Sequence, residues 1–244
     1  MTTTDRTTDR WTRAVRDQVG LGRLLPLGGV RDGAWISEQA AAAVLRHAAQ
    51  GMRGVRLGVL RIGLADPEDV HEPAVPPPPS ALPPGPLRVT ADFAATAAEP
   101  LPTTAERLRG LLATTSTDRL GLTVTEVDLR VTALLDEDAE PVPVRQPEPA
   151  RAAKPGDPDE ERAAAAALAT AGVTRLTGTL GGLGHAVHIE RRQTGAALPH
   201  RYVRVEIAVS ADHRAVDVAR EVRERVREAL ADHPTVAVLV TAVS

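Results

Sequence analysis

The chain has 244 residues, a formal net charge of −3 and no cysteine. The absence of thiols excludes disulfides, thiolate metal sites and cysteine nucleophiles. The nearly balanced charge provides no overall electrostatic attraction to nucleic acid or anionic lipid. Apolar residues make up 43% of the chain but aromatic residues only 2%, so the core must be built from Val, Leu, Ile and Ala. Lysine occurs once against 28 arginines, a bias typical of a GC-rich genome such as that of an actinobacterium.

The first 30 residues are expected to form an N-terminal arm. Trp11, Val15 and Val19 recur every four residues, which predicts a short amphipathic helix. The sequence has neither a signal-peptide core nor a run of about 20 apolar residues, so we expect a cytoplasmic protein that is at most peripheral at the inner face of the membrane. The arm is expected to dock on its own domain, on a protein partner or on a membrane surface, and docking on its own domain is the simplest interpretation. Its candidate partner-binding residues are Trp11, Leu21, Leu24 and Leu25.

A first α+β domain is predicted over residues 31–135. Ser37 is placed to cap a helix over 38–50, with the apolar Ile36 before the cap. A strand over 55–64 follows, and its alternation of apolar residues shifts face as at a β-bulge.

A proline-rich loop over residues 67–86 interrupts this domain. Its four consecutive prolines lack amide hydrogens and favour polyproline II. It is either a docking motif for an aromatic-lined groove of a partner or a rigid loop inserted between two strands. We favour the inserted loop.

The second half of the chain repeats the pattern of the first. Residues 87–134 predict an alternating strand, a helix over 105–115 and a closing strand that ends in VTAL. Residues 203–243 predict the same order, with the helix over 214–230 and a closing strand that ends in VTAV. We therefore expect an α+β fold of two similar repeats, each a small antiparallel or mixed sheet packed by two helices. Four strand residues are expected to face the helix-packed cores: Leu87, Val131, Val203 and Val240.

A mobile linker is predicted over residues 136–158, which are rich in proline and charge. The second domain, 159–244, is expected to begin with an alanine-rich helix over 160–171. A glycine-rich turn then predicts a β-hairpin between strands over 173–180 and 185–192.

The sequence offers no catalytic signature, so we expect no enzyme activity, cofactor or metal. His185 and His188 lie three residues apart in a predicted strand and face opposite sides, which disfavours a shared metal ion. Arg88 and Arg204 each follow the first apolar residue of an alternating strand. They are candidate anion contacts in a cleft between the repeats, although solvent-exposed strand residues are the simpler interpretation.

Four segments resemble the alkaline shock protein family, the envelope stress response family of Gram-positive bacteria: ISEQAAAAVLRHAA, PLRVTADFAA, AERLRGLLATT and LGLTVTEVDLRVTAL. The family's closing-strand pattern falls on Gly121, Leu122, Val124, Val127, Leu129 and Val131. The resemblance covers residues 32–135 without the proline loop, and the second repeat only from 202 to 243.

The resemblance implies a non-enzymatic cytosolic protein that associates with the envelope through a membrane-anchored partner and often self-assembles. It implies no direct insertion into the membrane. The alternative is a ligand-binding or regulatory module that uses the cleft between the repeats.

Overall fold

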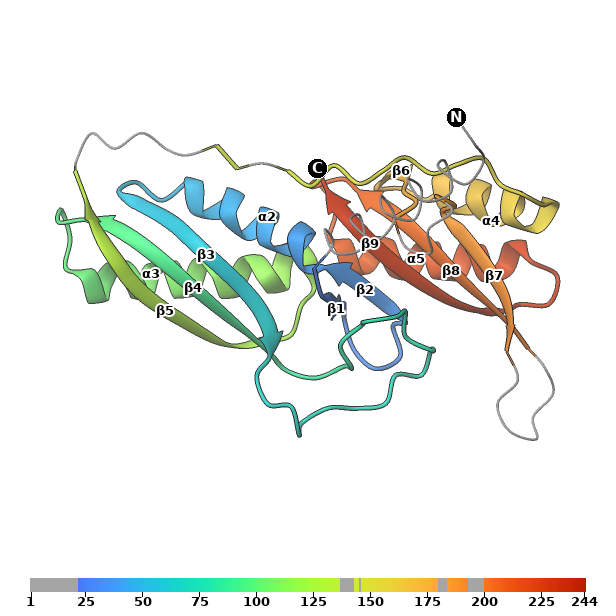
Figure 1. Cartoon of the computed structure of the whole chain (residues 1–244), viewed down its shortest axis with the longest axis horizontal. Coiled ribbons are helices and arrows are strands. Elements are labelled where there is room, and N and C mark those ends of the chain that lie inside the picture. The colour runs from blue at the N-terminus through green and yellow to red at the C-terminus, as the bar shows by residue number, and fades with distance from the viewer. Residues whose placement is uncertain (1–21, 137–142, 145, 180–183, 193–199) are drawn as a thin grey trace, which may run out of the picture.

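The computed structural model describes residues 22–136, 143–144, 146–179, 184–192 and 200–244. They form an α+β fold with two mixed sheets and four α-helices. The molecule is elongated, with one sheet in each half (Figure 1). No helix among these residues is long and apolar enough to cross a membrane.

The first unit has three strands, with β4 in the centre. β4 pairs antiparallel with β3 and parallel with β5. The bounds of its elements are α2 (Glu38–Gln50), β3 (Val55–Leu64), β4 (Leu87–Thr96), α3 (Leu101–Thr115), a short π-helical turn η1 (Ser116–Leu120) and β5 (Val124–Leu135). The predicted cap of α2 is confirmed, because the Ser37 hydroxyl accepts the Ala40 amide at 3.2 Å.

The second unit has the same order of elements around β8. β8 pairs parallel with β9 and antiparallel with both β6 and β7. The bounds are α4 (Pro158–Leu168), β6 (Val173–Leu176), β7 (Val187–Arg192), β8 (His200–Val209), α5 (Ala215–Ala229) and β9 (Thr235–Val243). The predicted hairpin over 173–192 is wrong. β6 and β7 follow one another along the same edge of β8, and each bonds to β8 instead of to the other.

Two short strands from the start of the chain complete the second sheet. β2 (Ala34–Ser37) pairs parallel with β9, and β1 (Leu24–Pro26) pairs antiparallel with β2. A single cluster of buried side chains runs through both units. The two units therefore share a core, and β2, which belongs to the predicted first domain, lies in the sheet of the second.

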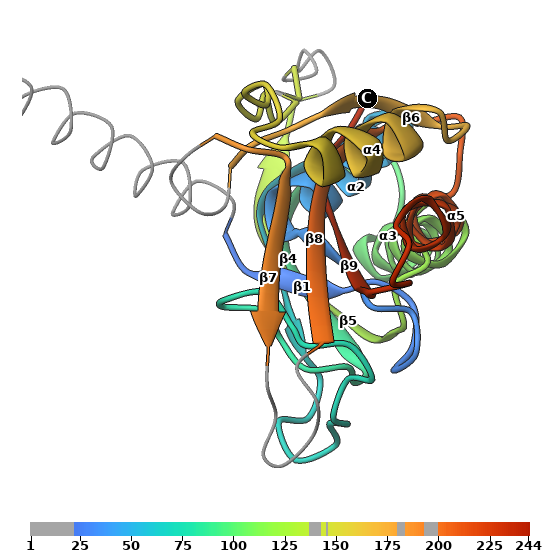
Figure 2. The same ribbon diagram turned by 90° about the vertical axis from the view of Figure 1, so that its right-hand side faces the viewer.

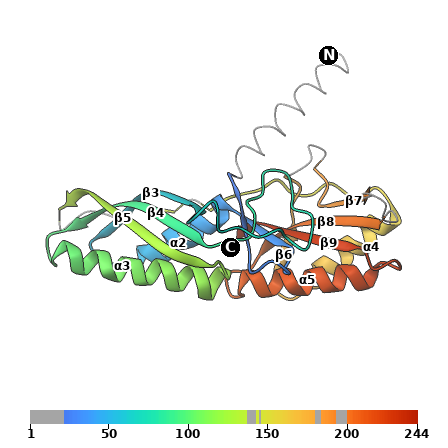
Figure 3. The same cartoon turned by 90° about the horizontal axis from the view of Figure 1, so that it is seen from below.

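The contact between the units is close at two further places. The Ser37 hydroxyl, besides capping α2, donates to the Thr241 carbonyl at 3.3 Å. Gly121 has φ +86° and lies against α5, where an added Cβ would come within 2.2 Å of a Val216 methyl. Glycine is therefore required both by its backbone conformation and by the approach of the helix. α3 and α5 follow one another along one side of the molecule (Figures 2 and 3).

The closing strands of the two units carry the same irregularity. Thr132 in β5 and Thr241 in β9 are each left out of the register with the neighbouring strand. The Thr132 hydroxyl donates to the Phe93 carbonyl at 3.3 Å, and the Thr241 hydroxyl donates to the Ile207 carbonyl at 3.2 Å. The sequence does not predict this shared irregularity, and it does not confirm the duplication.

The outer strands are also interrupted at matching places. A two-residue bulge breaks β3 opposite the stretch between Ala91 and Phe93. In the second unit, residues 177–186 separate β6 from β7. This interruption lies opposite the part of β8 between Val205 and Ile207. The second unit thus has ten residues where the first has a bulge of two, a difference of eight residues.

The proline-rich loop packs on the outer face of the second sheet. The Tyr202 hydroxyl donates to the Pro76 carbonyl at 2.9 Å, and the Trp35 indole N–H donates to the Leu82 carbonyl at 3.3 Å. The structure thus agrees with an inserted loop. The aromatic side chains that contact it belong to this chain itself, in a small apolar cluster of Leu24, Trp35, Val75, Tyr202, Ala237 and Leu239.

The second half of the predicted linker is held in place. The Gly178 amide donates to the Ala150 carbonyl at 3.1 Å, and the Ala153 amide donates to the Gly184 carbonyl at 2.6 Å. Asp157 then caps α4 by accepting two backbone amides. These contacts connect residues 150–157 to the second unit, while the predicted mobility of residues 136–158 stays a prediction. Residues 137–142 and 145 lie outside the described residues.

Candidate interaction surface

The residues predicted for partner binding in the N-terminal arm fall into two groups. Leu24 and Leu25 are 1% and 0% exposed, because β1 is a strand of the second sheet and both side chains pack inside the chain. This corrects the expectation that they are presented to a partner. Trp11 and Leu21, with the helix predicted around Trp11, lie outside the described residues.

The two candidate anion-binding arginines lie on different sheets and do not converge. Arg88 in β4 is half-buried, and its Nε donates to Glu126 at 2.6 Å. Arg204 in β8 is only 6% exposed, and its backbone lies opposite Ala237 in β9. The structure therefore gives no shared anion site built from these two residues.

The strand registers also show that Arg88 and Arg204 do not occupy equivalent positions in their sheets. Arg88 lies five residues before Phe93, the residue that pairs with β5 just before the bulge. The residue five places before Ile207 in the second unit is Tyr202, so Arg204 corresponds to Thr90. The error is a slip of two residues, which preserves the alternation of a strand and so is invisible to a pattern-based alignment.

The clearest difference between the units is the outer edge of the closing strand. β9 has β8 on one side and β2 on the other, whereas β5 pairs only with β4 among the described residues. β5 is 12 residues long and contains no proline. No described strand pairs with this edge, and Arg109 Nε donates to the Val127 carbonyl at 3.2 Å. A long strand without a neighbouring strand is a template for pairing with another chain.

Apolar side chains are exposed beside this open edge. Val131 and Leu134 are 39% and 66% exposed, and their counterparts in β9, Val240 and Val243, are 0% and 4% exposed. The prediction that Val131 faces a helix-packed core is therefore wrong, whereas Leu87, Val203 and Val240 are buried as expected. The physical reason is that α2, which follows β2 in the chain, packs against β9. No described helix takes that place beside Val131.

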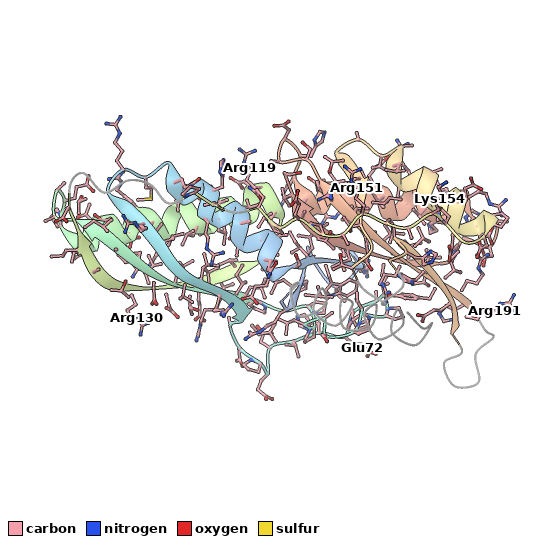
Figure 4. The ribbon with its side chains drawn as sticks, turned by 45° about the horizontal axis from the view of Figure 1, so that its top comes forward. Glu72, Arg119, Arg130, Arg151, Lys154 and Arg191 are labelled. Carbon is pink, nitrogen blue, oxygen red and sulfur yellow. The ribbon has the colours of Figure 1, made fainter. Side chains whose placement is uncertain are left out.

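The opposite face of the first sheet is polar and ordered by ion pairs. Arg130 donates to both carboxylate oxygens of Asp92, at 2.8 and 3.0 Å, and points away from the sheet (Figure 4). The hydrogen bond from Arg130 lowers the pKa of Asp92, and the same bond raises the pKa of Arg130. β5 therefore has an alternating character, with charges on one face and Val127, Leu129 and Val131 on the other.

The chain matches no family model, and no match to it was found among curated proteins or solved structures. The resemblance to alkaline shock proteins is thus carried by the residue patterns alone.

Proposed function

We propose that this chain is a non-enzymatic interaction protein that pairs with a second copy of itself through the open edge of β5. The observation that carries the proposal is the contrast between two equivalent strands. β9 is covered by β2 and α2, and β5 shows a free edge with exposed Val131 and Leu134.

The sequence of β5 is complementary to itself in the antiparallel direction. A two-fold axis at Leu129 brings Leu129 opposite its copy and places Val127 opposite Val131 of the second chain. It also places Asp128 opposite Arg130 twice, once on each side of the axis. Opposite charges and apolar pairs directly across two strands are both favourable, and a two-fold interface uses the same patch on both copies.

The test is the molar mass in solution, measured by light scattering. The full chain should form a dimer of twice 25.7 kDa, and Val131→Asp should shift it to the monomer. Leu168→Asp is the control, because Leu168 is 51% exposed on α4 in the second unit and is no part of β5. A monomeric full chain, or a Val131→Asp variant as dimeric as the control, contradicts self-association through β5.

We also propose that the protein works at the inner face of the cell envelope through a membrane-anchored protein partner. This part rests on the resemblance of residues 32–135 to alkaline shock proteins. It is consistent with a net charge of −3, which provides no basic excess for anionic lipid.

The envelope proposal is tested by mixing the purified chain with protein-free anionic vesicles and then with membranes of the native host. We expect flotation only with the host membranes, and loss of it after protease treatment of those membranes. A variant lacking residues 1–21 tests the arm without removing Leu24 and Leu25 from the core. Binding to the protein-free vesicles overturns the idea of a protein anchor.

A further inference from the structure

A pocket of about 240 Å³ lies in the second unit, between α4, the end of the linker and the junction of β6 with β7. It belongs to the half of the molecule that contains the second sheet, whereas β5 lies in the other half (Figure 1). The inference drawn from it is independent of self-association.

The walls of the pocket are tied to one another by hydrogen bonds. The Ala153 amide donates to the Gly184 carbonyl at 2.6 Å, which joins the linker to the segment before β7. The Gly156 amide donates to the Glu160 carboxylate at 2.6 Å, which joins the linker to α4. The pocket is therefore preformed, and a ligand need not order its walls.

Most of the lining is apolar, and its polar residues are two glutamates and one histidine. Glu160 and Glu161 come from the first turn of α4, and the His185 Nδ1 lies 3.7 Å from the Glu160 carboxylate. The described lining contains no arginine or lysine. The apolar part consists of Ala153, Pro155, Ala164, Ala165, Leu168, Leu176, Ala186 and Val187.

We propose that this pocket binds a small apolar amine. The ammonium group would donate to the Glu160 carboxylate, and the hydrocarbon part would lie against Leu176 and Val187. Two carboxylates, with His185 as the only basic residue of the described lining, favour a cationic ligand over an anion. A cavity of roughly 150 Å³ suffices for benzene, so this pocket has room for one ring and a short chain, and it is smaller than the sites of drug-sized ligands.

The probe is 2-phenylethylamine, compared with 2-phenylethanol and phenylacetate, which share its ring but not its charge. Isothermal titration of the full chain should show binding of the amine with a dissociation constant of about 1 mM or lower. The alcohol should bind at least 5-fold more weakly and the anion at least 10-fold more weakly.

Two variants connect the binding to this pocket. Glu160→Gln keeps an acceptor for the Gly156 amide but removes the charge, and should weaken amine binding at least 5-fold. Ala165→Phe, at an exposed position of the lining, should fill the pocket and abolish binding while the melting temperature stays near that of the parent. Glu224→Gln on α5 is the matched control and should bind like the parent.

Three results would overturn the proposal. They are no amine binding at about 10 mM, equal binding of amine and phenylacetate, or unchanged binding in a folded Glu160→Gln variant.

Discussion

The closing strands β5 and β9 pair in the same direction with their neighbours and carry the same bulged threonine, yet one lies on the surface and the other in the interior. β9 is covered on its free side by β2 and on its helix face by α2 and α5. β5 lacks the counterpart of β2 and α2 within the described residues, and Val131 is 39% exposed where Val240 is 0% exposed. The neighbouring strands and helices thus decide whether a strand residue is buried. The alternation of apolar and polar residues along the strand does not determine this.

The largest effect should come from an acidic residue at the position that the two strands share. Val240→Asp places an unpaired carboxylate in the core, which should cost about 4 kcal/mol or more of unfolding free energy. Val131→Asp should cost less than about 1 kcal/mol, because the side chain can reach water. Chemical denaturation of the two variants measures the difference, and similar losses at both positions would show that the comparison of β5 with β9 is wrong.

A smaller effect is expected where the proline-rich loop of the first unit covers the sheet of the second. Trp35 is 1% exposed and donates to the Leu82 carbonyl, so Trp35→Ala should cost about 3–5 kcal/mol of unfolding free energy. The loop should also become the first site of cleavage in limited proteolysis, because it loses its contact with the sheet. Unchanged stability and an uncut loop would show that the loop is held by other contacts.

The ion pair between Asp32 and Arg220 should contribute less, about 1 kcal/mol, because its arginine is half-exposed. Arg220 donates to both carboxylate oxygens, at 2.8 and 2.9 Å, and links the turn before β2 to α5. This hydrogen bond lowers the pKa of Asp32 in the folded chain. The contribution is therefore present above the unfolded pKa of about 3.9 and is lost as pH falls through the lower, folded pKa.

Asp32→Asn tests this directly. The variant should be less stable than the parent at pH 7, and the difference should shrink as pH falls below about 4. Asp92→Asn, which removes the exposed pair with Arg130 in the first sheet, is the control and should have a smaller effect. A stability difference for Asp32→Asn that stays constant down to acidic pH would show that the charge of Asp32 is not its cause.

Local signals in the sequence predicted most of the helices and strands. The serine cap and the apolar residue before it located the start of α2, and the 3.6-residue period located α5 to within one residue at each end. The shifted alternation predicted the bulge in β3. These features depend on residues within a few positions of one another.

The arrangement of the two sheets could not be predicted in the same way. β2 bonds to β9 some 200 residues away, and a run of four residues gives no indication of that partner. The false hairpin and the misaligned arginines have the same origin, because alternation describes a strand but not the strand beside it. The open edge of β5 is likewise visible only once β2 has been located on the other sheet.

The most direct test of the account uses two charge reversals in β5. In the pairing centred on Leu129, Asp128→Arg sets two arginines against each other across the interface, and Arg130→Asp sets two aspartates against each other. Each variant alone should sediment as a monomer, and an equimolar mixture should form a heterodimer, because every cross-strand charge pair is then restored. A monomeric mixture, or single variants as dimeric as the parent, would contradict the pairing of β5 with a second copy.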